Sequence, residues 1–174
     1  MQKAVRSILV FTFLFGCADA PRDTEQLADS GWEVAPADLP KLGTVNAKAR
    51  QELENWQAYK DFEAGFNRIY DTEYREDFVL VVDDLVEKQK ALEASEYPER
   101  FNAPQVKGRQ KVVKTFILKV KGDLIYRQNP EASIKQLIEA FNDLRSQFNI
   151  MVNYVLPDEL IQEGMQMKKD SVVP

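Results

Sequence analysis

The sequence predicts an all-α protein: an antiparallel up-down bundle of four helices that follows a flexible N-terminal tether. Apolar residues recur at steps of three and four along four segments of similar length, as they do on the buried face of a helix. The links between the segments are short, which favours antiparallel neighbours. The four segments cover approximately 45–71, 72–95, 104–128 and 130–156, within a bundle expected to span 45–160.

The first segment, 45–71, carries two apolar stripes that are out of register with each other. Two successive steps of three residues at their junction predict a stammer, which rotates the buried face around the helix. Glu63 is then placed either at the edge of the rotated core face or in a polar pocket inside the bundle. Asp71-Thr72 is the predicted break before the second segment, although the two segments could also form one long helix. The stripes are Ala49, Leu53 and Trp56, then Tyr59, Phe62, Phe66 and Ile69.

The second segment, 72–95, has a single stripe. Its run from Phe78 to Val82 alone resembles a strand, but the helical spacing on either side favours a helix. The stripe consists of Tyr74, Phe78, Val81, Val82, Leu85 and Leu92.

The third segment, 104–128, permits two interpretations. Its apolar residues share one helical face, but Gly108 and Gly122 lower its helix propensity. The alternative is an α+β fold with a β-hairpin across 112–126 that turns at Lys121-Gly122-Asp123. The residues on the helical face are Val106, Val113, Phe116, Ile117, Val120 and Leu124.

The fourth segment, 130–156, has the clearest helical pattern. Asn129-Pro130-Glu131 is a helix start, since it supplies a capping side chain, a proline at the first helical position and a carboxylate near the positive end of the helix dipole. Pro157 is the predicted end. The stripe consists of Ile134, Leu137, Phe141, Leu144, Phe148, Met151 and Val155.

The N-terminus has the layout of a secretory signal. Lys3 and Arg6 precede an apolar run, Ile8 to Phe15, which is too short to span a membrane as a helix. Leu14-Phe15-Gly16-Cys17 closes this run and resembles the lipobox of bacterial lipoproteins, although Phe15 is larger than the usual residue. The resemblance implies that residues 1–16 are a signal peptide and that Cys17 becomes the lipidated N-terminus.

The resemblance also indicates where the protein is sorted. In such lipoproteins an acidic residue directly after the cysteine favours the inner membrane, and this chain has Ala18 there, with Asp19 one position later. We therefore expect a lipid anchor in the outer membrane of a Gram-negative bacterium. Several acyl chains would hold the protein there firmly, whereas one chain binds only marginally.

Two segments outside the bundle are predicted to be flexible. Residues 17–44 comprise the lipidated cysteine and an acidic tether with three prolines and no helical periodicity, and residues 161–174 form a C-terminal tail. Trp32 is the exception within the tether. It is either an incidental aromatic residue or an anchor for a partner.

Composition excludes several classes of function. Histidine is absent and Cys17 is the only cysteine, which removes Ser-His-Asp and Cys-His catalysis, histidine-ligated zinc or haem and the Glu-x-x-His di-iron site. Without Lys3 and Arg6, the 23 basic residues fall to 21 against 28 acidic ones, a net charge of −7. Such a charge argues against nucleic acid as a partner. We predict no cofactor and no enzymatic activity.

Carboxylates on the second segment do not predict a metal site. Asp83 and Asp84 are adjacent on a helix and so point in different directions, with Glu87 following one turn later. Calcium and magnesium need several converging oxygen ligands. We therefore predict no bound metal.

A row of lysines marks one face of the third segment. This face is either solvated, with some pairing to neighbouring helices, or a contact for an anionic surface such as lipid headgroups, a cell-wall polymer or an acidic protein. Together with the lipobox, it leads us to expect a non-catalytic binding or structural module of the cell envelope. The alternative is a carrier or sensor that holds an apolar ligand between its helices. The lysines are Lys107, Lys111, Lys114 and Lys121.

Overall fold

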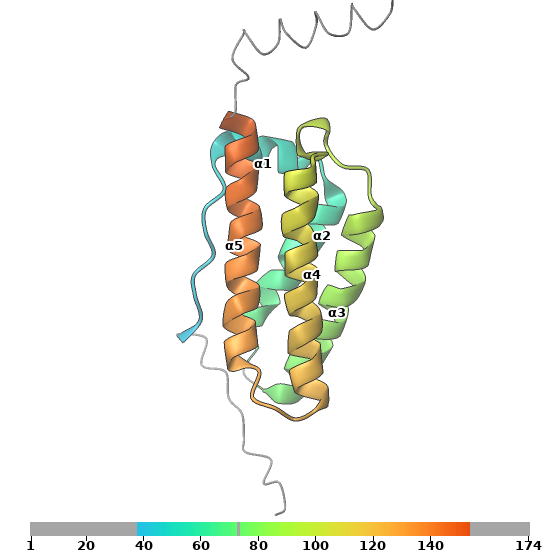
Figure 1. Ribbon diagram of the computed structural model, residues 1–174, viewed down its shortest axis with the longest axis vertical. Coiled ribbons are helices and arrows are strands. Elements are labelled where there is room, and N and C mark those ends of the chain that lie inside the picture. The colour runs from blue at the N-terminus through green and yellow to red at the C-terminus, as the bar shows by residue number, and fades with distance from the viewer. Residues whose placement is uncertain (1–37, 73, 154–174) are drawn as a thin grey trace, which may run out of the picture. The chain divides into compact units, whose positions relative to one another are not determined.

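The computed structural model describes residues 38–72 and 74–153, and this part of the chain is all-helical (Figure 1). Five α-helices and two short 3-10 helices form a bundle with antiparallel neighbours, as predicted. The hairpin alternative is wrong, because residues 112–125 lie within one continuous helix. The elements in chain order are α1 (Ala47–Glu54), α2 (Gln57–Asn67), η2 (Arg68–Asp71), α3 (Arg75–Ala94), η3 (Glu99–Phe101), α4 (Pro104–Ile125) and α5 (Glu131–Asn153).

The first predicted segment is divided into two helices instead of one helix with a stammer. α1 ends at Glu54, and the backbone of Trp56 leaves the helical region (φ −102°, ψ 88°) before α2 begins. The Trp56 indole N–H donates to the Ser95 hydroxyl at 2.8 Å, which fixes the ring at the junction. Because the two stripes lie on separate helices, each helix can turn its own apolar face to the core, and no rotation of the buried face within one helix is needed.

The predicted break at Asp71-Thr72 is confirmed. η2 ends at Asp71, and Thr72 is extended (φ −116°, ψ 118°). The Thr72 hydroxyl donates to the carbonyl of Arg68 at 2.7 Å, which satisfies a carbonyl that the helix end would otherwise leave open. One long helix through residue 95 is therefore excluded.

Local signals also set the starts of helices. The Asn46 side chain accepts from the Ala49 N–H and caps α1. Before α5, the Asn129 side chain accepts a hydrogen bond from the Glu131 N–H at 2.9 Å, so the predicted start of the fourth segment is confirmed.

Aromatic side chains fill the interior between α2 and α5. Phe141 lies 4.2 Å from Phe66 and 5.5 Å from Phe62, measured between ring centroids. Phe148 makes an edge contact with Tyr59 at 5.3 Å. All five rings are fully buried, so these stripe residues form the core as predicted.

Residues 38–46 run along α5, although the sequence assigns 38–44 to the flexible tether. The Asn142 side chain accepts from the Gly43 N–H at 2.7 Å, and the Arg145 guanidinium donates to the Gly43 carbonyl at 2.8 Å. One turn further, the Asn149 amide donates to the Thr44 carbonyl at 2.9 Å. Side chains of α5 thus supply the hydrogen bonds that this extended segment cannot make within itself.

The bundle has two distinct ends (Figure 1). At the entry end, where the described chain begins, the Tyr70 hydroxyl donates to the Pro40 carbonyl at 2.7 Å, and the Arg75 guanidinium donates to the Leu124 carbonyl at 2.7 Å. At the opposite, distal end, the α1–α2 junction meets the link between α3 and α4. Among the described residues, no helix has the length and hydropathy needed to cross a membrane.

Candidate functional site

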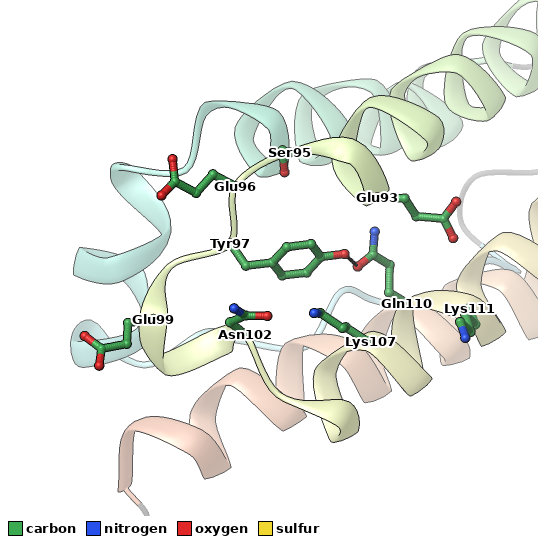
Figure 2. Close-up of a pocket in the computed structure, with 9 residues that line it drawn as sticks. All are labelled: Glu93, Ser95, Glu96, Tyr97, Glu99, Asn102, Lys107, Gln110 and Lys111. Atoms are coloured by element: carbon green, nitrogen blue, oxygen red, sulfur yellow. Dashed lines mark hydrogen bonds between the residues drawn. The ribbon is translucent and has the colours of Figure 1, made fainter.

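A hollow of about 700 Å³ lies at the distal end, between the α3–α4 link and the first turns of α4 (Figure 2). Most of its lining side chains are polar or charged, so it can hold a polar ligand or a few side chains of a partner. The lining residues are Glu93, Ser95, Glu96, Tyr97, Glu99, Asn102, Lys107, Gln110 and Lys111.

The α3–α4 link is held at both of its ends, so this wall of the hollow is fixed by the fold. Ser95 follows the last residue of α3, and its hydroxyl donates to the Leu92 carbonyl at 2.8 Å while accepting from the Trp56 indole. Phe101 in η3 is fully buried and lies 4.7 Å from the ring of Phe148. The link therefore lines the hollow between a half-buried attachment at Ser95 and a fully buried one at Phe101.

Tyr97 divides the hollow from the aromatic core. Its ring lies 4.8 Å from Trp56, and the Lys107 ammonium lies 5.1 Å from the ring centroid, within the range of a cation–π contact. The Tyr97 hydroxyl donates to the Gln110 side-chain oxygen, as Figure 2 shows. Burial, and then the nearby Glu93 carboxylate, raise the pKa of Tyr97 above its usual value.

Two buried glutamines lie behind this wall. The Gln89 amide N–H donates to the Gln110 backbone carbonyl at 3.5 Å. The Gln89 side-chain oxygen and the Gln110 side-chain nitrogen have no hydrogen-bond partner among the described residues. Each unpaired buried polar atom costs about 1–3 kcal/mol. The two glutamines therefore lower the free energy of unfolding relative to apolar residues at the same positions.

The charged groups of the hollow have both signs. The Glu93 carboxylate is neutralised by Lys114 at 2.6 Å. Lys107 and Lys111 supply the cationic groups of the lining, whereas the Glu96 and Glu99 side chains point away from Tyr97 in Figure 2. The arrangement suits a partner that carries an anionic group.

The lining offers binding groups and no activated nucleophile. The Ser95 hydroxyl directs its proton to a backbone carbonyl, and the Tyr97 hydroxyl directs its proton to an amide oxygen. Nucleophilic catalysis needs a nucleophile within hydrogen-bonding reach of a base. In the part of the chain that the structure describes, no group of three or more carboxylates, cysteines or histidines is placed to hold a metal ion.

The structure divides the predicted lysine face. Lys107 and Lys111 line the hollow, whereas Lys114 pairs with Glu93 and Lys121 pairs with Asp83 on α3 at 2.8 Å. Half of the face therefore holds two helices together. Cys17 and Trp32 lie outside the described residues.

The other carboxylates considered for a cation are also paired with lysines. Asp84 lies 2.5 Å from Lys88, and Glu87 lies 2.7 Å from Lys90. Each acid thus has a lysine on its own helix.

Sequence reasoning did not select Tyr97 or Gln110. Gln110 lies four residues after Val106 and three before Val113, and so interrupts the buried stripe of α4 with a polar side chain. Gln89 does the same between Leu85 and Leu92 on α3. Polar residues on an apolar stripe were the signal that marked this region.

No protein-family model matches the chain, and the searches of curated proteins and of solved structures find no match.

Proposed function

We propose that the protein is a lipid-anchored module of the cell envelope, held in the outer membrane by Cys17, that binds a partner at the distal hollow and does not catalyse a reaction. The observation that supports this is the position of the hollow. It lies at the end of the bundle opposite to the entry end, where the described chain begins (Figure 1). An anchor ahead of residue 38 would therefore join the bundle at the end opposite to the hollow and leave the hollow free for a partner.

The dimensions are consistent with such a role. α4 has 22 residues and is therefore about 33 Å long, which separates the hollow from the entry end. A tether over residues 18–37 would reach up to about 70 Å if fully extended. The hollow could then contact a partner well beyond the membrane surface.

The chemistry of the hollow favours an envelope protein as the partner. Lys107 and Lys111 suit a carboxylate or another anion. An acidic peptide segment supplies such groups, and an anionic cell-wall polymer is the second candidate. A carrier of an apolar ligand would need an apolar cavity, whereas aromatic rings fill the space between α2 and α5.

Site-specific photo-crosslinking tests the proposal. A photo-reactive residue replaces Asn102, which lines the hollow, or Glu139, which is exposed on α5 away from it. We expect a discrete crosslinked species in the envelope from position 102 and none from position 139. Equal labelling from both positions, or apolar lipid that copurifies with the protein in native mass spectrometry, would favour a different function.

Charge reversal at the hollow supplies the matched control. Lys107→Glu combined with Lys111→Glu should abolish the crosslink from position 102. Lys48→Glu combined with Lys60→Glu changes the net charge equally at exposed positions on α1 and α2 and should leave the crosslink intact.

A further inference from the structure

We propose that the entry end of the bundle rests on the membrane surface and inserts an apolar patch into the lipid headgroup region. The inference rests on the proposed lipid anchor and adds a second, non-covalent contact to it. The patch, called the entry patch below, consists of Tyr74, Val79, Leu80, Ile125 and Tyr126.

The entry patch contains the most exposed large hydrophobic side chains of the described residues. Tyr126 is 77% exposed, Ile125 is 64% exposed, and Tyr74 and Leu80 are each 63% exposed. Tyr74 directly precedes α3 and Leu80 lies in its second turn, whereas Ile125 ends α4 and Tyr126 follows it; both helix ends lie at the entry end (Figure 1). Surface apolar residues that gather in one place mark an interaction site more often than scattered ones do.

Two contacts join the start of α3 to the end of α4 beside these side chains. The Arg75 guanidinium donates to the Leu124 carbonyl at 2.7 Å and joins the start of α3 to the end of α4. Val79 and Ile125 line the same hollow, of about 270 Å³, whose other lining residues are Val82, Leu124 and the ion pair of Asp83 with Lys121. The core does not require the patch, because α3 already buries Phe78, Val81, Val82 and Leu85 on its inner face.

The composition of the patch suits a bilayer surface. Tyrosine has an apolar ring and a polar hydroxyl and is enriched where hydrocarbon meets headgroups. Leu80 and Ile125 supply purely apolar surface, and the exposed Arg127 follows directly after Tyr126. Acidic side chains at the start of α3, Glu76 and Asp77, offset the basic ones, so apolar insertion and not net charge is the attractive term.

The point where the chain enters selects the membrane as the occupant. The described residues begin at Asp38, at this same end of the bundle, and only 20 residues separate it from Cys17. A lipid attached at Cys17 would keep the bundle close to the bilayer, so the contact of the entry patch with lipid would be intramolecular. Even a patch with a weak affinity for lipid would then bind the membrane. Contact through this end also holds the distal hollow away from the membrane.

A single labelled cysteine tests the inference in the lipidated mature protein, reconstituted into phospholipid vesicles. Lipidation consumes the Cys17 thiol, so a new cysteine is the only reactive one. Gln128→Cys places an environment-sensitive dye beside the entry patch, and Glu96→Cys places it at the distal end. We expect brominated acyl chains to quench the dye at position 128 and not at position 96.

Variants of the patch separate insertion from mere proximity. Leu80→Ser with Ile125→Ser should reduce the quenching at position 128 several-fold. Val112→Ser with Ile150→Ser alters two exposed apolar residues outside the patch and should not change it. The serine variants replace exposed side chains, and circular dichroism establishes that both pairs remain folded.

Three outcomes overturn the inference. In the first, iodide, a quencher dissolved in water, quenches the dyes at positions 128 and 96 equally. In the second, the serine variants of the patch leave quenching by brominated acyl chains unchanged. In the third, the dye at position 128 is shielded from iodide only when the protein is concentrated in the vesicles and becomes accessible when it is diluted with lipid. The last result would indicate a second copy of the chain as the occupant. The intact mass of the protein measures lipidation independently of the dye. If Cys17 is unmodified, the proposed anchor is wrong. If the protein is lipidated but the dye at position 128 is exposed to water, only the membrane contact is wrong.

Discussion

Arg145 on α5 and Glu63 on α2 form an ion pair that is largely shielded from water, with side-chain exposures of 8% and 17%. Glu63 also accepts from Arg50 and from the Tyr59 hydroxyl, each at 3.2 Å. Arg145 donates in addition to the Gly43 carbonyl at 2.8 Å. One carboxylate and one guanidinium therefore connect α1, α2, α5 and the segment 38–46. Glu63 lies at the edge of the core, which is the first of the two positions that the sequence allowed.

Removal of Arg145 should destabilise the protein strongly. Arg145→Ala leaves the poorly hydrated Glu63 carboxylate with only the partly exposed Arg50 as a cationic partner and removes a donor to the Gly43 carbonyl, and the expected loss is about 3 kcal/mol in the free energy of unfolding. Arg109→Ala is the matched control, because its pair with Asp143 is about half exposed and should contribute about 0–1 kcal/mol. Urea denaturation measures both. If both variants lose the same free energy of unfolding, the shielded pair of Arg145 and Glu63 contributes no more to stability than an exposed pair.

Stability should fall in alkaline solution because of Tyr59. Burial, followed by the Glu63 carboxylate, raises the pKa of Tyr59 well above its usual value of 10. The unfolded chain then loses this proton at a lower pH than the folded one. The contribution of the protonated Tyr59 to the free energy of unfolding is therefore complete below about pH 10, and it is lost as the pH rises towards the pKa of Tyr59 in the folded protein.

The Tyr59→Phe variant isolates this effect. It should flatten the decline in the free energy of unfolding above about pH 10, while phenolate absorbance follows the remaining tyrosines. Tyr126→Phe is the control, since this side chain is the most exposed large hydrophobic described. An alkaline decline that is identical in both variants would contradict the assignment to Tyr59.

Truncation of the aromatic core should be costly. Phe141→Ala and Phe148→Ala each remove a fully buried ring and should lower the free energy of unfolding by about 3–5 kcal/mol. Lys135→Ala on the same helix loses only a partly exposed pair with Glu131 and should be nearly neutral. Thermal or chemical denaturation decides, and small losses at both phenylalanines would contradict a tightly packed core.

The lysines that line the hollow should differ from Lys121 in their effect on binding. Lys107→Gln with Lys111→Gln should weaken the crosslink from position 102, and increasing salt should mimic this loss, because exposed charges are screened within about 8 Å at physiological ionic strength. Lys121→Gln removes only the pair with Asp83, so it should leave the crosslink unchanged and cost about 0–1 kcal/mol in stability. A crosslink that Lys121→Gln weakens as much as the double variant does would contradict this prediction.

Cys17 should carry the membrane anchor. The expected intact mass is that of a chain beginning at Cys17 with attached acyl groups. Cys17→Ala should release a protein that is still folded by circular dichroism, because residues 38–153 form the core without it. A retained Met1 or a free thiol at Cys17 in membrane-purified protein would contradict lipidation.

The sequence by itself determined the helices and several of their ends. Apolar spacing is a local property, so the stripe of α5, the capping Asn129 and the break after Asp71 could all be identified from neighbouring residues. The class of fold followed, since four amphipathic segments of similar length have few other ways to bury their stripes.

Only the tertiary structure decided where the chain breaks at Trp56, where residues 38–46 lie and how the distal hollow forms. Trp56 is fixed by Ser95, which is 39 residues away, and Gly43 is fixed by Asn142, which is 99 residues away. Likewise, Gln110 and Tyr97 become neighbours only when the link folds back from α3 to α4. Each feature depends on hydrogen bonds between residues distant in sequence, and the periodicity of a single segment contains no information about such partners.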